Sequence, residues 1–394
     1  MNQELKKFIL ESKLIYNQSL YFLRQAYFGC KKNSIKIVTP SYIDLYKLVK
    51  STESFSTSCL DYVVKQGVIK QAYTSWKSFI RATIEFNKAP NKFLSRPKLP
   101  NYLKKDNNLI TIDSTRLRTT GCKINEIRLP NSAFKFVLPR YITRSKIKCL
   151  RILKNYQKLK IEIIYEKEQN LKNYNNSHTI GIDIGLNNLA AITSNELNFS
   201  MLINGRPLKS INQFYNKMLG DLKSKGATKK IDKLSHKRKM KVDNYLHWAS
   251  RQVISICLAN GVSKIVIGKN DSWKQGINLG KRTNQNFVMI PFAKFIQMIQ
   301  YKAGEVGIDV KLTEESYTSK IDHLAHEGLH KQEHYLGKRT KRGLFKSSTG
   351  RVLNADINGA IGILRKVNEI TDVHLMNLRN RGDAVSPKLL NKAA

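Results

Sequence analysis

The chain has 394 residues, of which 69 are Lys or Arg and 29 are Asp or Glu, so its formal net charge is +40. A chain of this length can form two or three domains, and a hydrophobic share of 41% excludes a disordered polyelectrolyte. The excess positive charge is spread along the chain and predicts a nucleic acid as the partner, with an anionic membrane surface as the weaker alternative.

The sequence contains no sign of export or membrane insertion. No apolar run reaches the length of a transmembrane helix, and the opening "MNQELKKFILESK" lacks the apolar core of a signal peptide. The cysteines are scattered without a CxxC pair, at Cys30, Cys59, Cys122, Cys149 and Cys257. This spacing favours a reducing cytoplasm over a disulfide framework or a cysteine zinc site.

Residues 1–90 carry the helical pattern and residues 91–175 the strand pattern. "LKKFILESKLIYNQSLYFLRQAYF" and "VIKQAYTSWKSFIRATIEF" place apolar residues at helical spacing. After a proline-punctuated basic boundary, short alternating runs from about residue 108 to 170 predict a small β-barrel. Tyr73, Trp76 and Tyr102 are candidates for stacking on nucleotides, with packing in a core as the alternative.

Residues 176–370 alternate strand and helix and predict an α/β layer with some parallel strands. The strand "TIGIDIG" is followed at once by "LAAIT", which predicts a hairpin, and "IVIGKN" and "GIDVKL" predict further buried strands. Between the hairpin and the next apolar helix lies a lysine-rich segment, residues 217–241. It indicates either a solvated helical face or, as we expect in so basic a chain, a helix that follows phosphates.

Two aspartates occupy positions where a carboxylate is unusual and calls for a structural or functional explanation. Asp183 ends a buried strand, where a carboxylate costs several kcal/mol unless it is paired or binds a metal. Asp356 opens a helix whose first turns are small residues, so that helix can lie close to a sheet; an N-cap role for Asp356 is the simpler alternative. Two such carboxylates can hold Mg²⁺ or Mn²⁺ for phosphodiester hydrolysis. An actin-type ATPase would need glycine-rich phosphate loops that the sequence lacks.

Six ordered segments resemble the TnpB (OrfB) proteins of bacterial insertion sequences, the transposon relatives of the type V CRISPR effectors. The resemblance covers about residues 11 to 367 and is carried by "GIDIGLNNLAAIT", "NGRPLKSINQFYNK", "GKNDSWKQ", "ESYTSK", "GKRTKRGLF" and "NADINGAIGILRK". It implies a multidomain α+β chain: a helical recognition lobe (1–90), a β-barrel wedge domain (91–175), an RNase H-like (RuvC) α/β nuclease domain (176–370) and a C-terminal tail (371–394).

The resemblance also implies a function. A guide RNA from the transposon end would pair with double-stranded target DNA beside a short target-adjacent motif, and the RuvC site would cut with Mg²⁺ or Mn²⁺. Such a protein would be cytoplasmic, nucleoid-associated and bacterial. A plain RNA-binding protein would fit the charge but leave the paired acids unexplained.

The sequence departs from the family pattern where many members carry a zinc knuckle of two CxxC pairs. The corresponding interval, about residues 318–350, has no cysteine and offers only His323, His326, His330 and His334 at helical spacings. Solvent-facing histidines on a basic helix are the more ordinary interpretation, so zinc is not expected. The basic loop around "GKRTKRGLF" is expected to contact phosphates instead.

A second departure concerns the middle acid, because Gly268 stands where the usual Glu would end its strand. Either another carboxylate substitutes, or the protein is an inactive RNA-guided DNA binder that represses by occupancy. Retention of both aspartates favours the enzyme. The next strand should lie parallel and adjacent, with its tip at Glu314 and Glu315; we choose Glu315, which directly precedes "SYTSK", over Glu314, Asp322 and Glu327.

The predicted catalytic and metal-binding residues are therefore Asp183, Glu315 and Asp356. The predicted nucleic-acid-binding residues lie in the two basic segments: Lys229, Lys230, Lys237, Arg238, Lys239, Lys338, Arg339, Lys341 and Arg342.

Overall fold

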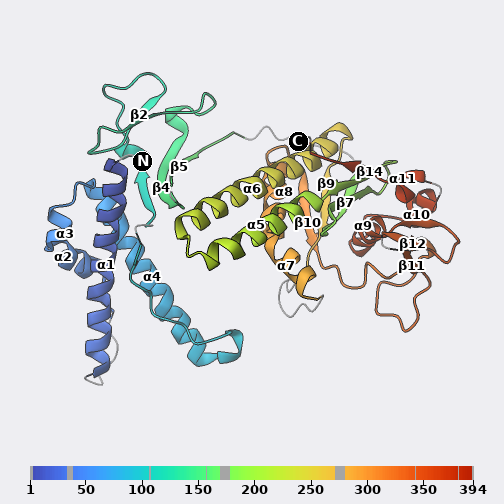
Figure 1. Ribbon diagram of the computed structural model, residues 1–394, viewed down its shortest axis with the longest axis horizontal. Coiled ribbons are helices and arrows are strands. Elements are labelled where there is room, and N and C mark those ends of the chain that lie inside the picture. Colours follow the sequence, from blue (N-terminus) through green and yellow to red (C-terminus); the bar gives the residue numbers. More distant parts are fainter. Residues whose placement is uncertain are drawn as a thin grey trace. The chain divides into compact units, whose positions relative to one another are not determined.

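The computed structural model divides the chain into two compact units, Met1–Glu168 and Gln169–Ala394 (Figure 1). The residues that the structure describes are 3–32, 39–105, 108–156, 158–168, 178–270, 280–341, 343–379 and 381–392.

The first unit begins with helices, as the sequence predicts: α1 (Gln3–Lys32), α2 (Tyr42–Lys50), α3 (Glu53–Ser56) and α4 (Tyr62–Lys88). Ser41 caps α2 by accepting from the backbone N–H of Asp44, and Asp61 caps α4 in the same way through Val63. The long helices α1 and α4 pack against each other. They bury the apolar stripes that the helical spacing in the sequence indicates.

Five predicted strands of the first unit are present: β1 (Ile110–Asp113), β2 (Glu126–Arg128), β3 (Lys135–Val137), β4 (Ile147–Asn155) and β5 (Lys158–Tyr165). They pair antiparallel as a three-stranded sheet, β1-β4-β5, and a separate β2-β3 hairpin. The described strands therefore do not close into the barrel that the sequence predicts.

Helices and strands of the first unit share a single core. Leu20 of α1, Trp76 of α4, and Ile110 and Leu150 of the sheet belong to the same buried cluster. Trp76 is 1% exposed and Tyr73 packs against this cluster, so core packing accounts for both. Tyr102 is 38% exposed, and the guanidinium of Arg24 lies 4.6 Å from its ring centroid.

The second unit is built on a six-stranded mixed sheet of order β10-β9-β6-β7-β8-β14. As predicted, β6 and β7 form a hairpin, and β9 and β10 follow parallel to β6. The bounds are β6 (Thr179–Asp183), β7 (Asn188–Ser194), β8 (Ser200–Asn204), β9 (Lys264–Gly268), β10 (Asp309–Thr313) and β14 (Lys388–Leu390).

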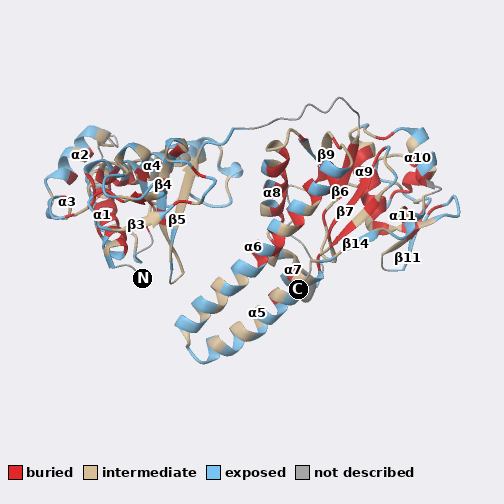
Figure 2. Cartoon of the chain, turned by 90° about the horizontal axis from the view of Figure 1, so that it is seen from above, coloured by how far each residue is buried: buried red, intermediate tan, exposed pale blue. Residues whose placement is uncertain are grey.

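The two faces of this sheet are covered by different helices (Figure 2). One face, with Ile182 and Ile267, packs against α6 and α8; the other, with Val266, packs against α9. Alternate strand residues point to opposite faces, so Asp183 and Gly268 face α9. The helices are α5 (Arg206–Ser224), α6 (Thr228–Ala259), α7 (Lys281–Met289), α8 (Phe292–Gly304), α9 (Ala355–Lys366), α10 (Asp372–Arg379) and α11 (Gly382–Val385).

The predicted basic helix forms half of a helical hairpin. Buried residues of α6 begin only at Val242, and α5 buries only Leu208 and Asn212. Figure 2 shows the joined ends of α5 and α6 projecting from the sheet as a largely exposed pair. The described part of the chain has no helix both long and apolar enough to cross a membrane.

The last residues differ from the expected tail. Instead of trailing away, they form α10 and α11 and then β14, which pairs parallel with β8 as the edge strand of the sheet. A small antiparallel sheet precedes α9, formed by β11 (Lys338–Lys341), β12 (Leu344–Lys346) and β13 (Val352–Asn354).

Candidate active site

Asp183 ends β6 and lies directly over a glycine of α9. A Cβ added at Gly359 would lie 2.6 Å from Asp183 Oδ2, and one added at Gly181 would lie 2.5 Å from the carbonyl oxygen of Ala360. No residue with a side chain fits these positions without movement. The small residues of "NADINGAIGILRK" therefore let α9 approach the strand closely enough to cover its acid.

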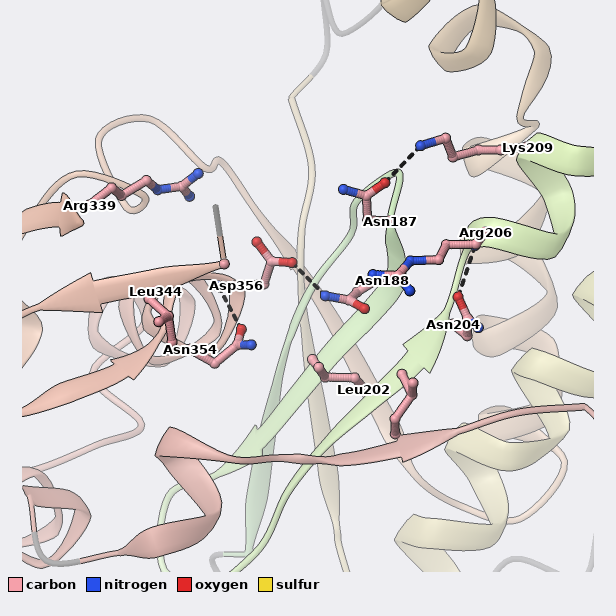
Figure 3. A pocket seen from close by; sticks show the side chains of 12 residues that line it. Asn187, Asn188, Leu202, Asn204, Arg206, Lys209, Arg339, Leu344, Asn354 and Asp356 are labelled. Carbon is pink, nitrogen blue, oxygen red and sulfur yellow. Dashed lines mark hydrogen bonds between the residues drawn. The ribbon is translucent and has the colours of Figure 1, made fainter. Parts of the chain in front are cut away.

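Asp356 reaches the same place from the first turn of α9. Its backbone N–H donates to Asn354 Oδ1 at 3.0 Å, so Asn354 is the N-cap and Asp356 is not. Asn188 Nδ2, at the start of β7, donates to Asp356 Oδ2 at 2.8 Å (Figure 3). The Asp356 carboxylate is thus oriented by a side chain from the hairpin that carries Asp183.

The two aspartates interact electrostatically. Burial and then the nearby charge of Asp356 raise the pKa of Asp183 to about 7, against the opposing effects of the Arg339 guanidinium and the Ile184 backbone N–H. Like charges held this close disfavour ionisation of both carboxyls. A cation would reduce the repulsion between the two carboxylates, and in this structure Arg339 supplies part of that positive charge.

Glu315 lies over Gly268, the position of the absent middle acid. In the parallel register Thr313 of β10 is the partner of Gly268, and Glu315 follows two residues later. A Cβ added at Gly268 would lie 2.5 Å from Glu315 Cγ and 2.4 Å from its Oε1. Glu315 is half-buried, whereas Glu314 is exposed.

The residues fit a divalent cation in part. Asp183 and Asp356 offer hard oxygen ligands, and their mutual repulsion is the electrostatic condition that a cation relieves. Within the described residues, however, no three His, Cys, Asp or Glu side chains converge closely enough to hold an ion. Glu315 lies at the same end of the sheet and would need to turn toward the aspartates to join them.

A cavity of about 770 Å³ opens beside Asp356. Its lining contains Arg206, Lys209 and Arg339, one carboxylate (Asp356) and several asparagines (Figure 3). The predicted phosphate-binding residues Lys338, Arg339 and Lys341 are exposed on β11. Arg342, predicted with them, falls outside the described residues.

The predicted basic residues of α6 divide into two groups. Lys229, Lys230, Lys237 and Lys239 are exposed on its projecting half. Arg238 differs, because its guanidinium donates to Asn212 Oδ1 at 2.8 Å and to the Met289 carbonyl at 2.9 Å. Arg238 therefore ties α6 to α5 and to the end of α7, and contact with a phosphate would compete with those bonds.

Two family models match parts of the chain. Residues 162–274 match the model described as "Probable transposase" (OrfB of the IS605 type), and residues 292–363 match "Cas12f1-like, TNB domain". Over these two ranges the chain is similar to the TnpB (OrfB) family and its Cas12f relatives. The matched ranges contain Asp183 in the first case, and Glu315 and Asp356 in the second.

One solved structure extends the likeness in fold to most of the chain. The protein of a Cas12f1–sgRNA–target DNA complex is 15% identical and aligns over 92% of this chain and 83% of its own, with a TM-score of 0.57. A CRISPR-Cas12f ternary complex aligns at 15% identity over 91% and 80%, with a TM-score of 0.36. The first of these shows a shared fold. No curated protein gave a significant match.

The interval of residues 318–350, where the sequence lacks the expected cysteines, is organised by buried carboxylates. Asp322 is fully buried, and its Oδ2 accepts from Ser347 Oγ at 2.8 Å and from the Ser348 backbone N–H at 2.7 Å. Glu327 accepts from the backbone N–H groups of Asp322 and Leu336. These bonds join the start of the interval to the end of β12.

The histidines do not form the predicted exposed helix. The one helical turn there is the 3₁₀-helix η4 (His323–Ala325). His323 is fully buried, with Nε2 2.7 Å from the Thr318 carbonyl and Nδ1 3.0 Å from Arg365 Nη1. Burial lowers the pKa of His323 to about 4, so the ring is neutral and both its nitrogens are occupied. His330 and His334 are exposed.

Sequence reasoning missed three residues that line the same cavity as Asp356: Asn188, Arg206 and Lys209. Their segments "GLNN" and "NGRPLKS" carry the family resemblance, which was the available signal. Their positions depend on how the turn after β6 packs against the start of α5, and neither periodicity nor composition determines that packing.

Proposed function

We propose that this protein is an RNA-guided DNA endonuclease that cuts target DNA by metal-dependent phosphodiester hydrolysis beside a short target-adjacent motif. The observation that carries the proposal is the pair Asp183–Asp356. The close approach of α9 to β6 at Gly359 and Gly181 accompanies a strongly raised pKa of Asp183. A fold does not require two repelling carboxylates in one place, whereas a nuclease does.

The carboxylates of Asp183 and Asp356 would hold Mg²⁺ or Mn²⁺, with Glu315 as the third ligand. When bound, the ion supplies a Lewis acid that activates water and stabilises the leaving 3′ oxygen. The remaining work falls to side chains of this chain. Asn188 keeps Asp356 oriented through its 2.8 Å hydrogen bond. The Arg339 guanidinium, which attracts Asp183 in this structure, would instead bind a phosphate oxygen of the strand being cut.

The proposed partners are a guide RNA from the transposon end and double-stranded target DNA. A net charge of +40 suits a channel that holds a heteroduplex by its backbone. The Cas12f1 chain of similar fold was solved with an sgRNA and target DNA. Exposed lysines on the α5–α6 hairpin and on β11 are the candidates for the backbone contacts. We place the protein in the cytoplasm, associated with the nucleoid.

The experiment is to sequence the RNA that copurifies with the protein and to test plasmid cleavage by that complex in Mg²⁺. An enriched transcript from the transposon end and a cut in matched targets alone are expected. Asp183→Ala and Asp356→Ala should abolish the cut with target binding retained, because each removes a metal ligand and no phosphate contact. Guided binding without any cut by the unaltered protein would instead indicate a repressor that acts by occupancy.

A further inference from the structure

The start of α5 is held against the turn that follows Asp183. The Gly205 backbone N–H donates to the Asn187 carbonyl at 2.7 Å. A Cβ added at Gly205 would lie 2.4 Å from the Leu186 carbonyl oxygen, so only glycine allows this approach. The first turn of α5 is therefore in direct contact with the turn of the hairpin that carries Asp183 and Asn188.

Two basic residues of that first turn are held by asparagines in different ways: Lys209 through its ammonium and Arg206 through its backbone. Lys209 Nζ donates to Asn187 Oδ1 at 2.8 Å, and the Arg206 backbone N–H donates to Asn204 Oδ1 at 3.0 Å (Figure 3). Asn204 is held in turn, since its Nδ2 donates to Asn391 Oδ1 at 2.8 Å, just after β14. The Asn187 amide is neutral, so it holds the Lys209 ammonium without neutralising its charge, whereas Asn204 holds the backbone of Arg206.

The charge of the cavity favours a polyanion. Its lining holds three cations (Arg206, Lys209 and Arg339) against the single carboxylate of Asp356. In the view of Figure 3, Arg339 lies on one side of Asp356, and Arg206 and Lys209 lie on the other. A strand whose scissile phosphate meets the aspartates would bring a neighbouring phosphate to Arg206 and Lys209. The volume of about 770 Å³ is within the range of ligand pockets.

We propose that Arg206 and Lys209 form a phosphate subsite of the active site, which binds the backbone phosphate adjacent to the scissile one in the DNA strand being cut. The subsite rests on the proposed nuclease function. It fixes the direction in which the strand enters, because the two cations are on one side of Asp356 only. It also requires at least one further nucleotide on that side of the cut.

The test uses guide-loaded protein and targets that carry one neutral methylphosphonate linkage at each position near the cut. In the unaltered protein, one linkage beside the cut should slow cleavage about tenfold or more. In Arg206→Gln/Lys209→Gln the same linkage should add less than about twofold to an already slower reaction, because these two cations no longer bind that phosphate. Lys331→Gln, an exposed lysine outside the α5–α6 hairpin and β11, is the matched control and should behave like the unaltered protein. Equal sensitivity in the double variant and the unaltered protein would overturn the subsite.

A binding measurement separates the subsite from the nuclease activity. With Asp183→Asn protein, the affinity for a short single-stranded oligonucleotide is followed against salt. Adding Arg206→Gln/Lys209→Gln should lower the slope by about 0.7, because the protein then neutralises one phosphate fewer. Lys209→Arg, which keeps the charge, should restore part of it. A changed slope with no cleavage of any target would reject the nuclease and keep the subsite; cleavage with an unchanged slope and unchanged methylphosphonate sensitivity would do the reverse.

Discussion

The Glu315 carboxyl group occupies the space above Gly268. A methyl group at Gly268 would lie 2.4 Å from Glu315 Oε1 and 2.6 Å from Cδ1 of Ile363 on α9. The strand that lacks an acid and the acid from the next strand are therefore complementary: the glycine is small because the glutamate lies there. This relationship gives a physical account of how the middle carboxylate could move from β9 to the end of β10.

Glu315→Gln should abolish cleavage and leave target binding intact, because the amide keeps the shape but loses the charge that a metal ligand needs. Glu314→Gln is the control, since Glu314 is exposed at the preceding position. It should cut at the unaltered rate. Cleavage and binding are measured on the same matched target. Loss of cleavage in the control alone would move the ligand by one residue, and full activity in both would place the third carboxylate elsewhere.

Returning the acid to β9 should restore part of the activity that Glu315→Ala removes. In Gly268→Glu/Glu315→Ala the new glutamate side chain can enter the space that Glu315 vacates, and its carboxylate can replace that of Glu315. We expect at least about tenfold faster cleavage than in Gly268→Ala/Glu315→Ala, which has the same backbone change without the carboxylate. Equal rates in the two double variants would mean that the space over Gly268 does not communicate with the reacting centre.

The sequence predicted the parts of the site that follow from strand and helix patterns. The hairpin after Asp183, the parallel order β6-β9-β10 and the small-residue start of α9 are all as expected. The fold of residues 318–350 was not predictable in this way, because buried hydrogen bonds organise it. His323 shows the difference. Its spacing indicated an exposed helix, yet its ring is buried against Gly362 and is hydrogen-bonded to Arg365.

The raised pKa of Asp183 predicts a stability penalty in metal-free protein. An acid whose folded-state pKa is about 7, against 3.8 as the ordinary value, binds its proton more tightly when folded. Stability is therefore lost as pH rises from about 4 to 7, and the full loss persists above 7. Asp183→Asn should stabilise the protein at pH 8 by at most about 4 kcal/mol, from about 1.4 kcal/mol per unit, and by nothing below pH 4.

Denaturant unfolding of the chelated protein at several pH values measures this effect. Saturating Mg²⁺ should stabilise the unaltered protein more than Asp183→Asn, and more at pH 8 than at pH 6, because the ion competes with the proton. Asp309→Asn, at an exposed position of β10, is the control and should show no such pH dependence. An Asp183→Asn variant that is less stable than the unaltered protein at pH 8 would contradict the assigned electrostatics.

The last prediction concerns Asp322, whose buried carboxylate stabilises the interval where many relatives bind zinc. Asp322→Ala would leave the Ser347 hydroxyl and the backbone N–H groups of Ser348 and Ala325 without their acceptor. An unsatisfied buried donor costs about 1–3 kcal/mol, so a loss of about 3 kcal/mol is expected in this interval. Because local opening can precede global unfolding, amide hydrogen exchange of residues 321–350 is the sharper measurement.

In Asp322→Ala, faster exchange should appear in residues 321–350 and not in β6 or β9. Glu333→Gln, a change at an exposed position of the same interval, is the control and should leave exchange unchanged. In the unaltered protein, a zinc-selective chelator should change neither exchange nor the unfolding midpoint, because both ring nitrogens of His323 are occupied by protein groups. Stoichiometric zinc in a tag-free preparation, or chelator-induced exchange confined to this interval, would show that a metal rather than Asp322 holds it together.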